Sequence, residues 1–176
     1  MDLIIPTISQ GLLWALLAIG VYLTFRVLDI ADLTVEGSFP LGAATAASLL
    51  AAGVTPLLAI FAAFVAGMIS GVVTGLLTTK LKIPALLAGI LTMIALYSVN
   101  IRIMGKANTP LLGVNTMMTF FTDRCGFTAA NASLGVGAVF VVCIVALMYW
   151  FFGTEIGSAM RATGNNERMV RALGVN

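Results

Sequence analysis

Residues 56–78 read PLLAIFAAFVAGMISGVVTGLLT, a run without a single charged side chain. A helix needs roughly 20 mostly apolar residues to cross the hydrocarbon core of a bilayer, and Pro56 suits the first turn of a helix. The run lacks the alternation of apolar and polar residues that a membrane barrel strand shows. It therefore predicts a helix that spans a membrane.

The rest of the chain has the same character. Of its 176 residues, 60% are hydrophobic and only 9% charged, whereas soluble domains carry about 25% charged residues. Backbone groups in lipid must be satisfied within helices or a closed barrel. We predict an all-α, polytopic transmembrane helix bundle with about five spans, at residues 8–25, 39–52, 56–78, 84–104 and 134–152.

Two segments interrupt this regular pattern. The stretch 39–52 is short and has Pro40 near its start, so we expect an interrupted or tilted helix, which is stable only where protein buries it or where it lines a cavity. The connection 105–133 is long, and we expect residues 117–121 to form a short helix or to dip into the interface. The domains are then a transmembrane part, residues 1–152, and a polar tail, residues 153–176.

Basic residues give an orientation. With five spans, the side that holds the tail carries more of them than the other side, and short cytoplasmic loops carry the excess of Lys and Arg. We therefore expect the tail in the cytoplasm and the N-terminus outside. The side with the tail carries Arg26, Lys80, Lys82, Arg161, Arg168 and Arg171, and the other side carries Arg102, Lys106 and Arg124.

Several kinds of chemistry find no support in the sequence. The chain has no histidine, the commonest general base and metal ligand, and Cys125 and Cys143 lack metal-site spacing. The net charge of +2 is too small to indicate nucleic-acid binding. We expect no catalytic cluster, no enzymatic activity, no metal and no cofactor.

Small residues recur every four positions in the third span, at Ala63, Gly67, Gly71 and Gly75. Such a stripe lets two helices approach closely in lipid. Packing within the bundle is the favoured interpretation, and a subunit interface is the alternative.

An acidic cluster follows the first span. Asp29, Asp32 and Glu36 would share one helix face, near Thr34 and Ser38. Acidic groups at membrane depth usually face a cavity or a partner, so the cluster would line a translocation path or bind a proton. A solvated cytoplasmic connection is the simpler interpretation. In the fourth span, Asn100 near Tyr97 is expected to hydrogen-bond to another helix.

The tail predicts two short helices. Thr154 would cap the first, Gly164 would end it near Thr163, and Asn165 or Asn166 would cap a second over residues 167–173, with Gly174 past its end. Met169 and Leu173 form a small apolar face. Such a short helix needs a surface to dock on, either a groove in a cytoplasmic partner or the membrane.

The tail also carries a family resemblance. Its residues GSAMRATGN and ALGV resemble the cytoplasmic coupling segment of permease subunits of ABC importers in the branched-chain amino acid and ribose permease superfamily. The opening run, residues 9–43, is similar to a subgroup labelled as tryptophan/tyrosine permeases. Either this resemblance or the small apolar face of the second tail helix assigns ten positions to coupling with the ATPase. They are Gly157, Ala159, Arg161, Ala162, Gly164, Asn165, Met169, Ala172, Leu173 and Gly174.

The resemblance implies a mechanism and partners. Two permease subunits would form the path in a bacterial plasma membrane, two cytoplasmic ATP-binding cassette subunits would drive it, and an extracytoplasmic binding protein would deliver an amino acid or similar solute. The second helix lies near the path in that family, which favours Asp32, Thr34, Glu36, Gly37 and Ser38 as path residues. The chain lacks the G-x-x-x-x-G-K-[ST] phosphate loop, so the ATPase would be a separate subunit.

Two further expectations follow. Family members continue beyond the coupling segment with several more spans, so we expect a truncated product or a fragment. The competing functions are a proton-coupled secondary transporter that uses Asp32 and Glu36, and a membrane scaffold without transport activity.

Overall fold

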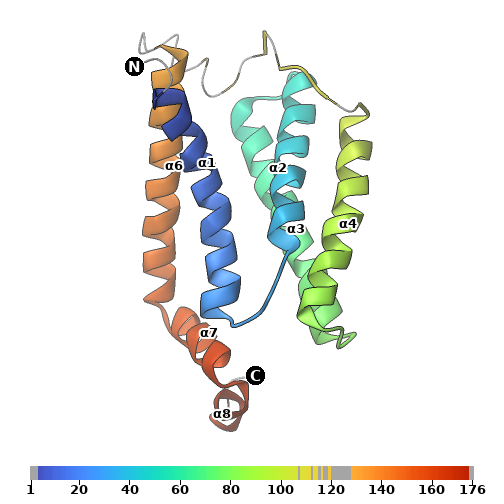
Figure 1. The fold of residues 1–176 in the computed structure, drawn as a ribbon, viewed down its shortest axis with the longest axis vertical. Helices are drawn as coiled ribbons and strands as arrows, with labels where there is room; N and C mark the ends of the chain where they lie inside the picture. Colours follow the sequence, from blue (N-terminus) through green and yellow to red (C-terminus); the bar gives the residue numbers. More distant parts are fainter. Residues whose placement is uncertain are drawn as a thin grey trace. The chain divides into compact units, whose positions relative to one another are not determined.

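The structure is a computed structural model that describes residues 4–106, 108–111, 113, 114, 116, 119 and 128–174. In these residues every regular element is a helix (Figure 1), which confirms the all-α prediction. The short helix expected at 117–121 falls almost entirely outside them. The elements are α1 (Ile4–Tyr22), the π-helical turn η1 (Leu23–Val27), α2 (Thr34–Ala51), α3 (Pro56–Thr79), α4 (Ala85–Met104), α6 (Ala129–Phe152), α7 (Glu155–Asn165) and α8 (Glu167–Ala172).

The chain divides into two compact units. Unit 1 comprises Met1–Ala31 and Ser133–Asn176, and unit 2 comprises Asp32–Ala132. Among the described residues, four helical segments are long and apolar enough to cross a membrane: Ile4–Val27, Pro56–Thr79, Ala85–Met104 and Asn131–Phe152. The expected fifth span corresponds to α2, which is not among them. Its 18 residues extend about 27 Å, and its first turn is polar.

α2 begins earlier than its apolar residues do. Hydropathy placed its start at Phe39, but the helix starts at Thr34 and continues without a break past Pro40. The expected interruption of this helix is therefore wrong. Pro40 has no N–H, so the carbonyl of Glu36 lacks its usual helical donor, yet the helix persists on both sides of the proline.

Unit 2 is a bundle of three closely packed helices. α2 runs antiparallel to α3 and parallel to α4 (Figure 1). A Cβ placed on Gly37 would lie 2.9 Å from the Cα of Met93 in α4, so only glycine allows this approach. Further along, the hydroxyl of Ser48 donates to the carbonyl of Ile103 over 3.1 Å. Small side chains at such contacts are typical of helices that pack in lipid.

The glycine stripe of α3 does not take part in this packing. A Cβ added to Gly67, Gly71 or Gly75 would meet no atom within 4 Å. Only Ala63 lies at an internal contact, opposite Gly42 of α2. Within unit 2 these three glycines therefore make no helix contact, because the side of α3 that faces α2 and α4 carries Ala59, Ser70 and Thr74. Packing against other helices of a larger bundle stays a prediction. A subunit interface at the glycines stays a prediction.

Unit 1 contains α1 and α6, followed by the tail helices. The hydroxyl groups of Ser9 and Ser133 are hydrogen-bonded, and Leu12 of α1 lies against Gly137 of α6. In the tail, Thr154 caps α7 by accepting the N–H of Gly157 at 3.3 Å, which confirms the predicted cap. These contacts place the start of α7 directly after the last turn of α6.

The second tail helix also follows the prediction. The side chain of Asn166 caps α8 by accepting the N–H of Met169 at 3.1 Å. Gly174, with φ +85°, follows the end of α8 in the left-handed conformation that favours glycine.

Candidate functional site

The acidic residues before α2 fold into unit 2. A side-chain oxygen of Asp32 accepts the backbone N–H of Thr34 at 2.8 Å and also its hydroxyl, a turn in which an aspartate organises the backbone two residues ahead. A Cβ on Gly89 of α4 would lie 2.8 Å from the nitrogen of Leu33 and 2.9 Å from the Asp32 oxygen. Glycine at position 89 therefore allows this turn to rest on α4.

Three buried threonines then join the three helices. The hydroxyl oxygens of Thr34 and Thr74 lie 2.9 Å apart, and Thr74 donates to Thr92 over 3.0 Å. These residues are 3%, 5% and 4% exposed, so each hydroxyl is satisfied away from water. Each such bond contributes about 0.5–1.5 kcal/mol. We call Asp32, Thr34, Thr74 and Thr92 the hydroxyl clamp.

The clamp sets the depth at which α2 begins. Gly37 lies beside Met93, which is about 12 Å along α4 from Ala85 and about 17 Å before Met104. The first turn of α2 therefore runs from the level of Gly89, about 6 Å along α4, to the level of Met93, near the middle of a helix long enough to span a membrane. The favoured interpretation of this region as a solvated loop is wrong for Thr34, which is helical and buried. Asp32 does lie in the connection before α2, where it is half-buried.

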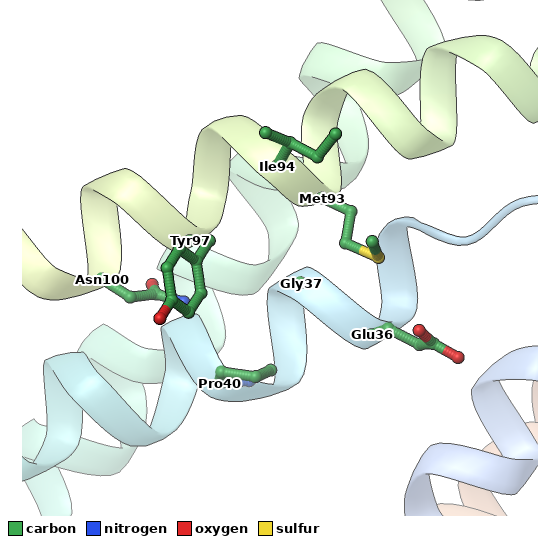
Figure 2. A pocket seen from close by; sticks show the side chains of 7 residues that line it. All are labelled: Glu36, Gly37, Pro40, Met93, Ile94, Tyr97 and Asn100. Atoms are coloured by element: carbon green, nitrogen blue, oxygen red, sulfur yellow. The ribbon is translucent and has the colours of Figure 1, made fainter.

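Glu36 lies on the exposed side of this turn, in a pocket of about 320 Å³ between α2 and α4. Figure 2 shows the side chains of Tyr97 and Asn100 close together, whereas the Glu36 carboxylate points away from the other lining side chains. An exposed carboxylate at this depth is costly against lipid and normally faces water or protein. The lining residues are Glu36, Gly37, Pro40, Met93, Ile94, Tyr97 and Asn100.

Asn100 does not make the interhelical hydrogen bond that the sequence suggested. It is only 7% exposed, and its side-chain oxygen has no hydrogen-bond partner in the described part of the chain. The predicted path residue Ser38 donates to the carbonyl of Val35 in its own helix. The pocket therefore gathers Glu36 and Gly37 from the predicted set and adds Asn100 and Tyr97.

In unit 1, α7 packs tightly on the end of the first span. A Cβ on Gly164 would lie 2.1 Å from the carbonyl oxygen of Val27 and 3.1 Å from the Cα of Leu28. The expectation that Gly164 ends the helix is wrong, since the helix continues to Asn165 and Asn166 begins the next one. Glycine is needed at 164 for contact with the backbone of Val27 and Leu28.

Two further contacts fix the other end of α7. A Cβ on Gly157 would lie 2.4 Å from the carbonyl oxygen of Phe151. The guanidinium of Arg161 donates to the carbonyl of Phe152 over 2.8 Å and lies 6.0 Å from the centre of that ring. α7 is thus attached to both η1 and the end of α6.

The tail also exposes apolar side chains. Ile156, Met169 and Leu173 are 67%, 51% and 74% exposed, whereas Val170 is 4% exposed. Exposed apolar groups on helices this short indicate a surface that a partner covers. Unit 1 therefore presents two tail helices, of which α7 is attached to the end of the first span and α8 exposes Met169 close to Leu173.

A family model described as branched-chain amino acid transport system / permease component matches residues 3–176. The chain belongs to this permease family. The match includes both the pocket of unit 2 and the tail helices of unit 1, which supports the resemblance seen in the sequence. With its apolar helices, the chain is a membrane protein.

Individual proteins similar to this chain are also permeases. The chain is 36% identical over 173 residues to a tyrosine transport system permease protein of Clostridioides difficile, covering 98% of this chain and 56% of the relative. It is 32% identical over 165 residues to a ribose import permease protein of Escherichia coli, covering 92% and 50%. The chain thus spans about half the length of the curated relatives it matches. No solved structure matches it significantly.

On this permease chain, the predicted coupling positions fall into two groups. Gly157, Ala159, Ala162 and Gly164 are buried or half-buried in α7, so they face the rest of unit 1. The exposed positions are Arg161, Asn165, Met169, Ala172, Leu173 and Gly174. The first group, together with the bond from Arg161 to Phe152, holds α7 in place, and the other exposed positions are accessible to another protein.

Sequence reasoning missed the threonines of the clamp in α3 and α4. Ser70, Thr74 and Thr78 recur every four residues in an otherwise apolar span, a polar stripe that marks the internal face of the helix. The glycines of the same helix meet no atom of another helix. The stripe of hydroxyl residues was the signal that could have identified the packed side.

Proposed function

We propose that this chain forms part of the membrane-spanning permease component of an ATP-driven ABC importer in a bacterial plasma membrane. In this proposal the face of unit 2 with Glu36 lines the path of the solute, and the segment 153–176 binds a separate cytoplasmic ATPase. The observation that carries it is the tail: a helix pair attached to η1 by glycine contacts that leaves Met169 and Leu173 exposed.

The attachment of α7 gives a route for mechanical coupling. Gly164 touches the backbone of Val27 and Leu28, and Asp32 of the clamp follows Leu28 by four residues. A displacement of α7 by the ATPase would therefore act on the short segment that leads into α2. Because the clamp joins α2 to α3 and α4, we expect the three helices to move together.

The complete assembly extends beyond this chain. We propose a permease homodimer, two ATP-binding cassette subunits in the cytoplasm and an extracytoplasmic solute-binding protein. The tail would lie on the cytoplasmic side, in agreement with its Arg161, Arg168 and Arg171. The printed names of the relatives, tyrosine and ribose permeases, point to a small polar solute, and the higher identity to the former favours an amino acid.

The test is copurification with the ATPase subunit of the same transport system. Leu173→Asp puts a charge on the exposed apolar surface, so we expect recovery of the ATPase to fall by about tenfold, since a buried apolar anchor is worth about 1.5–3 kcal/mol. Lys106→Ala changes the net charge by the same amount outside the tail, and recovery should not change. Equal recovery with both variants would argue against coupling through the tail.

A further inference from the structure

Unit 1 contains a groove between its two long helices. α1 and α6 touch near one end, where Ser9 is hydrogen-bonded to Ser133 and Leu12 lies against Gly137. They separate toward the other end, and α7 lies below the gap (Figure 1). A cavity of about 600 Å³ lies between them there, and this volume is within the range of ligand pockets.

The walls of this groove are apolar. The end of the first span contributes Leu23 and Val27, and α6 contributes Val145 and Met148. From Val145 to the end of α6 at Phe152, the wall extends about 10 Å. Both walls belong to segments that are apolar enough to span a membrane, so the groove suits the acyl chain of a lipid.

Aromatic side chains mark the mouth of the groove. Tyr22 and Tyr149 line it, and both are exposed, as is the adjacent Trp150. Tyr22 is the last residue of α1, and the other two lie in the last turn of α6. Exposed tyrosine and tryptophan gather at the level of the lipid headgroups, so this end of the groove is within reach of a headgroup.

A cation lies at this end. Of the ten described residues that line the groove, Arg161 of α7 alone is charged. Its guanidinium donates to the carbonyl of Phe152 over 2.8 Å and lies 6.0 Å from the centre of that ring, and Phe152 itself lines the groove. The charged group of Arg161, and not only its aliphatic part, is therefore placed at the groove.

The guanidinium can bind an anion in this position. It has five N–H donors in a planar group, and the residue is exposed, so a ligand can accept hydrogen bonds alongside Phe152. Arginine pairs with the oxygens of a phosphate through strong, charge-assisted bonds. Since none of the ten lining residues is acidic, no carboxylate of the groove competes with the phosphate.

We infer that the groove between α1 and α6 binds an anionic phospholipid, with its acyl chain along the apolar walls and its phosphate on Arg161. A free phosphate would leave the walls uncovered, and a zwitterionic phospholipid would bring an ammonium group to a groove without a carboxylate. Basic pockets between membrane helices suit such anionic headgroups. This site goes beyond the proposed function, which assigns no lipid to the chain.

The experiment uses the purified 176-residue chain in nanodiscs of phosphatidylcholine, with methionine methyl groups labelled by ¹³C for NMR. A small fraction of the lipid carries a nitroxide near the headgroup end of one acyl chain, either as phosphatidylglycerol or as phosphatidylcholine. Met148 lines the groove, so a nitroxide bound there broadens its methyl resonance, which Met148→Leu assigns. Met68, exposed on α3, reports on lipid that merely surrounds the protein.

We expect labelled phosphatidylglycerol to broaden the Met148 resonance about fivefold more than labelled phosphatidylcholine does, because one basic residue attracts an anionic lipid by about 1 kcal/mol. The Met68 resonance should respond equally to the two lipids. Arg161→Gln should reduce the ratio at Met148 to about one. Arg161→Lys keeps the charge and should retain most of the preference.

A matched variant and a second resonance serve as controls. Arg168→Gln removes the same charge from α8, outside the groove, and should leave the ratio at Met148 unchanged. Met160 of α7 lines a small cavity beside Leu28, so an unaltered Met160 resonance shows that α7 stays attached in Arg161→Gln. The ratio in the unaltered chain decides the inference by itself, and the variants assign it to Arg161.

Three results would overturn the inference. Equal broadening of Met148 by both labels would show that the groove takes up lipid without regard to charge. Broadening of Met68 but not of Met148 would show that protein, such as a helix of a second copy, fills the groove. An equal loss of preference in Arg168→Gln and Arg161→Gln would indicate general attraction to the tail. Because no ATPase is present, none of these results depends on the proposed coupling.

Discussion

Replacing Gly164 by alanine should detach α7 from the end of the first span. The new Cβ would lie 2.1 Å from the carbonyl oxygen of Val27, and it must retreat by about 0.9 Å to reach the 3.0 Å below which real Cβ contacts essentially never fall. The neighbouring atoms of Val27 and Leu28 are all backbone, so no side chain can rotate away. Overpacking of this kind costs about 1–3 kcal/mol.

The free energy of unfolding of unit 1 can be measured by titrating the protein from a mild detergent into sodium dodecyl sulfate. Trp14 and Trp150, the two tryptophans of the chain, both lie in unit 1, so their fluorescence follows this unit. Gly164→Ala should lower the free energy of unfolding by about 1–3 kcal/mol. The matched control is Gly11→Ala in α1, where a Cβ meets nothing within 4 Å.

Gly11→Ala should leave stability unchanged or raise it by about 0.5–1 kcal/mol, because alanine restricts the unfolded chain more than glycine does. The difference between the two variants isolates the contact with Val27 from the general effect of adding a methyl group. If Gly164→Ala is as stable as Gly11→Ala, the docking of α7 on the first span is wrong.

Three further substitutions test the fold. Thr74→Val should destabilise unit 2 by about 1–3 kcal/mol, because it removes the hydrogen bonds of the Thr74 hydroxyl to Thr34 and Thr92. Unfolding in detergent, followed by circular dichroism, measures this change. An unchanged unfolding midpoint would contradict the hydroxyl clamp. Gly37→Ala should destabilise the same unit by about 1–3 kcal/mol, because the new methyl group would collide with Met93. Gly75→Ala should not destabilise it. Equal unfolding midpoints for the two variants would exclude close packing of α2 on α4. Asn166→Ala should reduce the stability of α8 by about 1 kcal/mol, seen as faster amide hydrogen exchange in the tail; identical exchange would argue against the cap.

The composition of the chain was sufficient to predict the four helices that are long and apolar enough to cross a membrane in the described residues, although it also predicted a span at α2, which is not among them. The segment 56–78 was expected to be a span from its apolar length, and α3 runs Pro56–Thr79. The caps of the tail were also predictable, since Thr154 and Asn166 are residue types whose short side chains reach a backbone N–H. These features depend on neighbours within a few residues, which a sequence shows directly.

Features that depend on the partner helix were not predictable. Gly67 and Gly37 look alike in sequence, yet only Gly37 touches another helix. Gly164 looked like a helix end because its neighbours suggest one, whereas its contact is with Val27, far away in the chain. The sequence places Asp32 in a connection between spans, as the structure does, but it does not show that the side chain is half-buried there through its bond to Thr34 and its contact with Gly89.

The central claim is that the exposed side of the tail binds an ATPase subunit, and site-specific photo-crosslinking tests it most directly. p-Benzoylphenylalanine would replace Leu173, which is 74% exposed, or Phe61, which is 65% exposed on α3, in cells that also produce the ATPase of the same transport system. We predict an adduct with the ATPase from position 173 and none from position 61. Adducts from neither position, or equally from both, would contradict the claim.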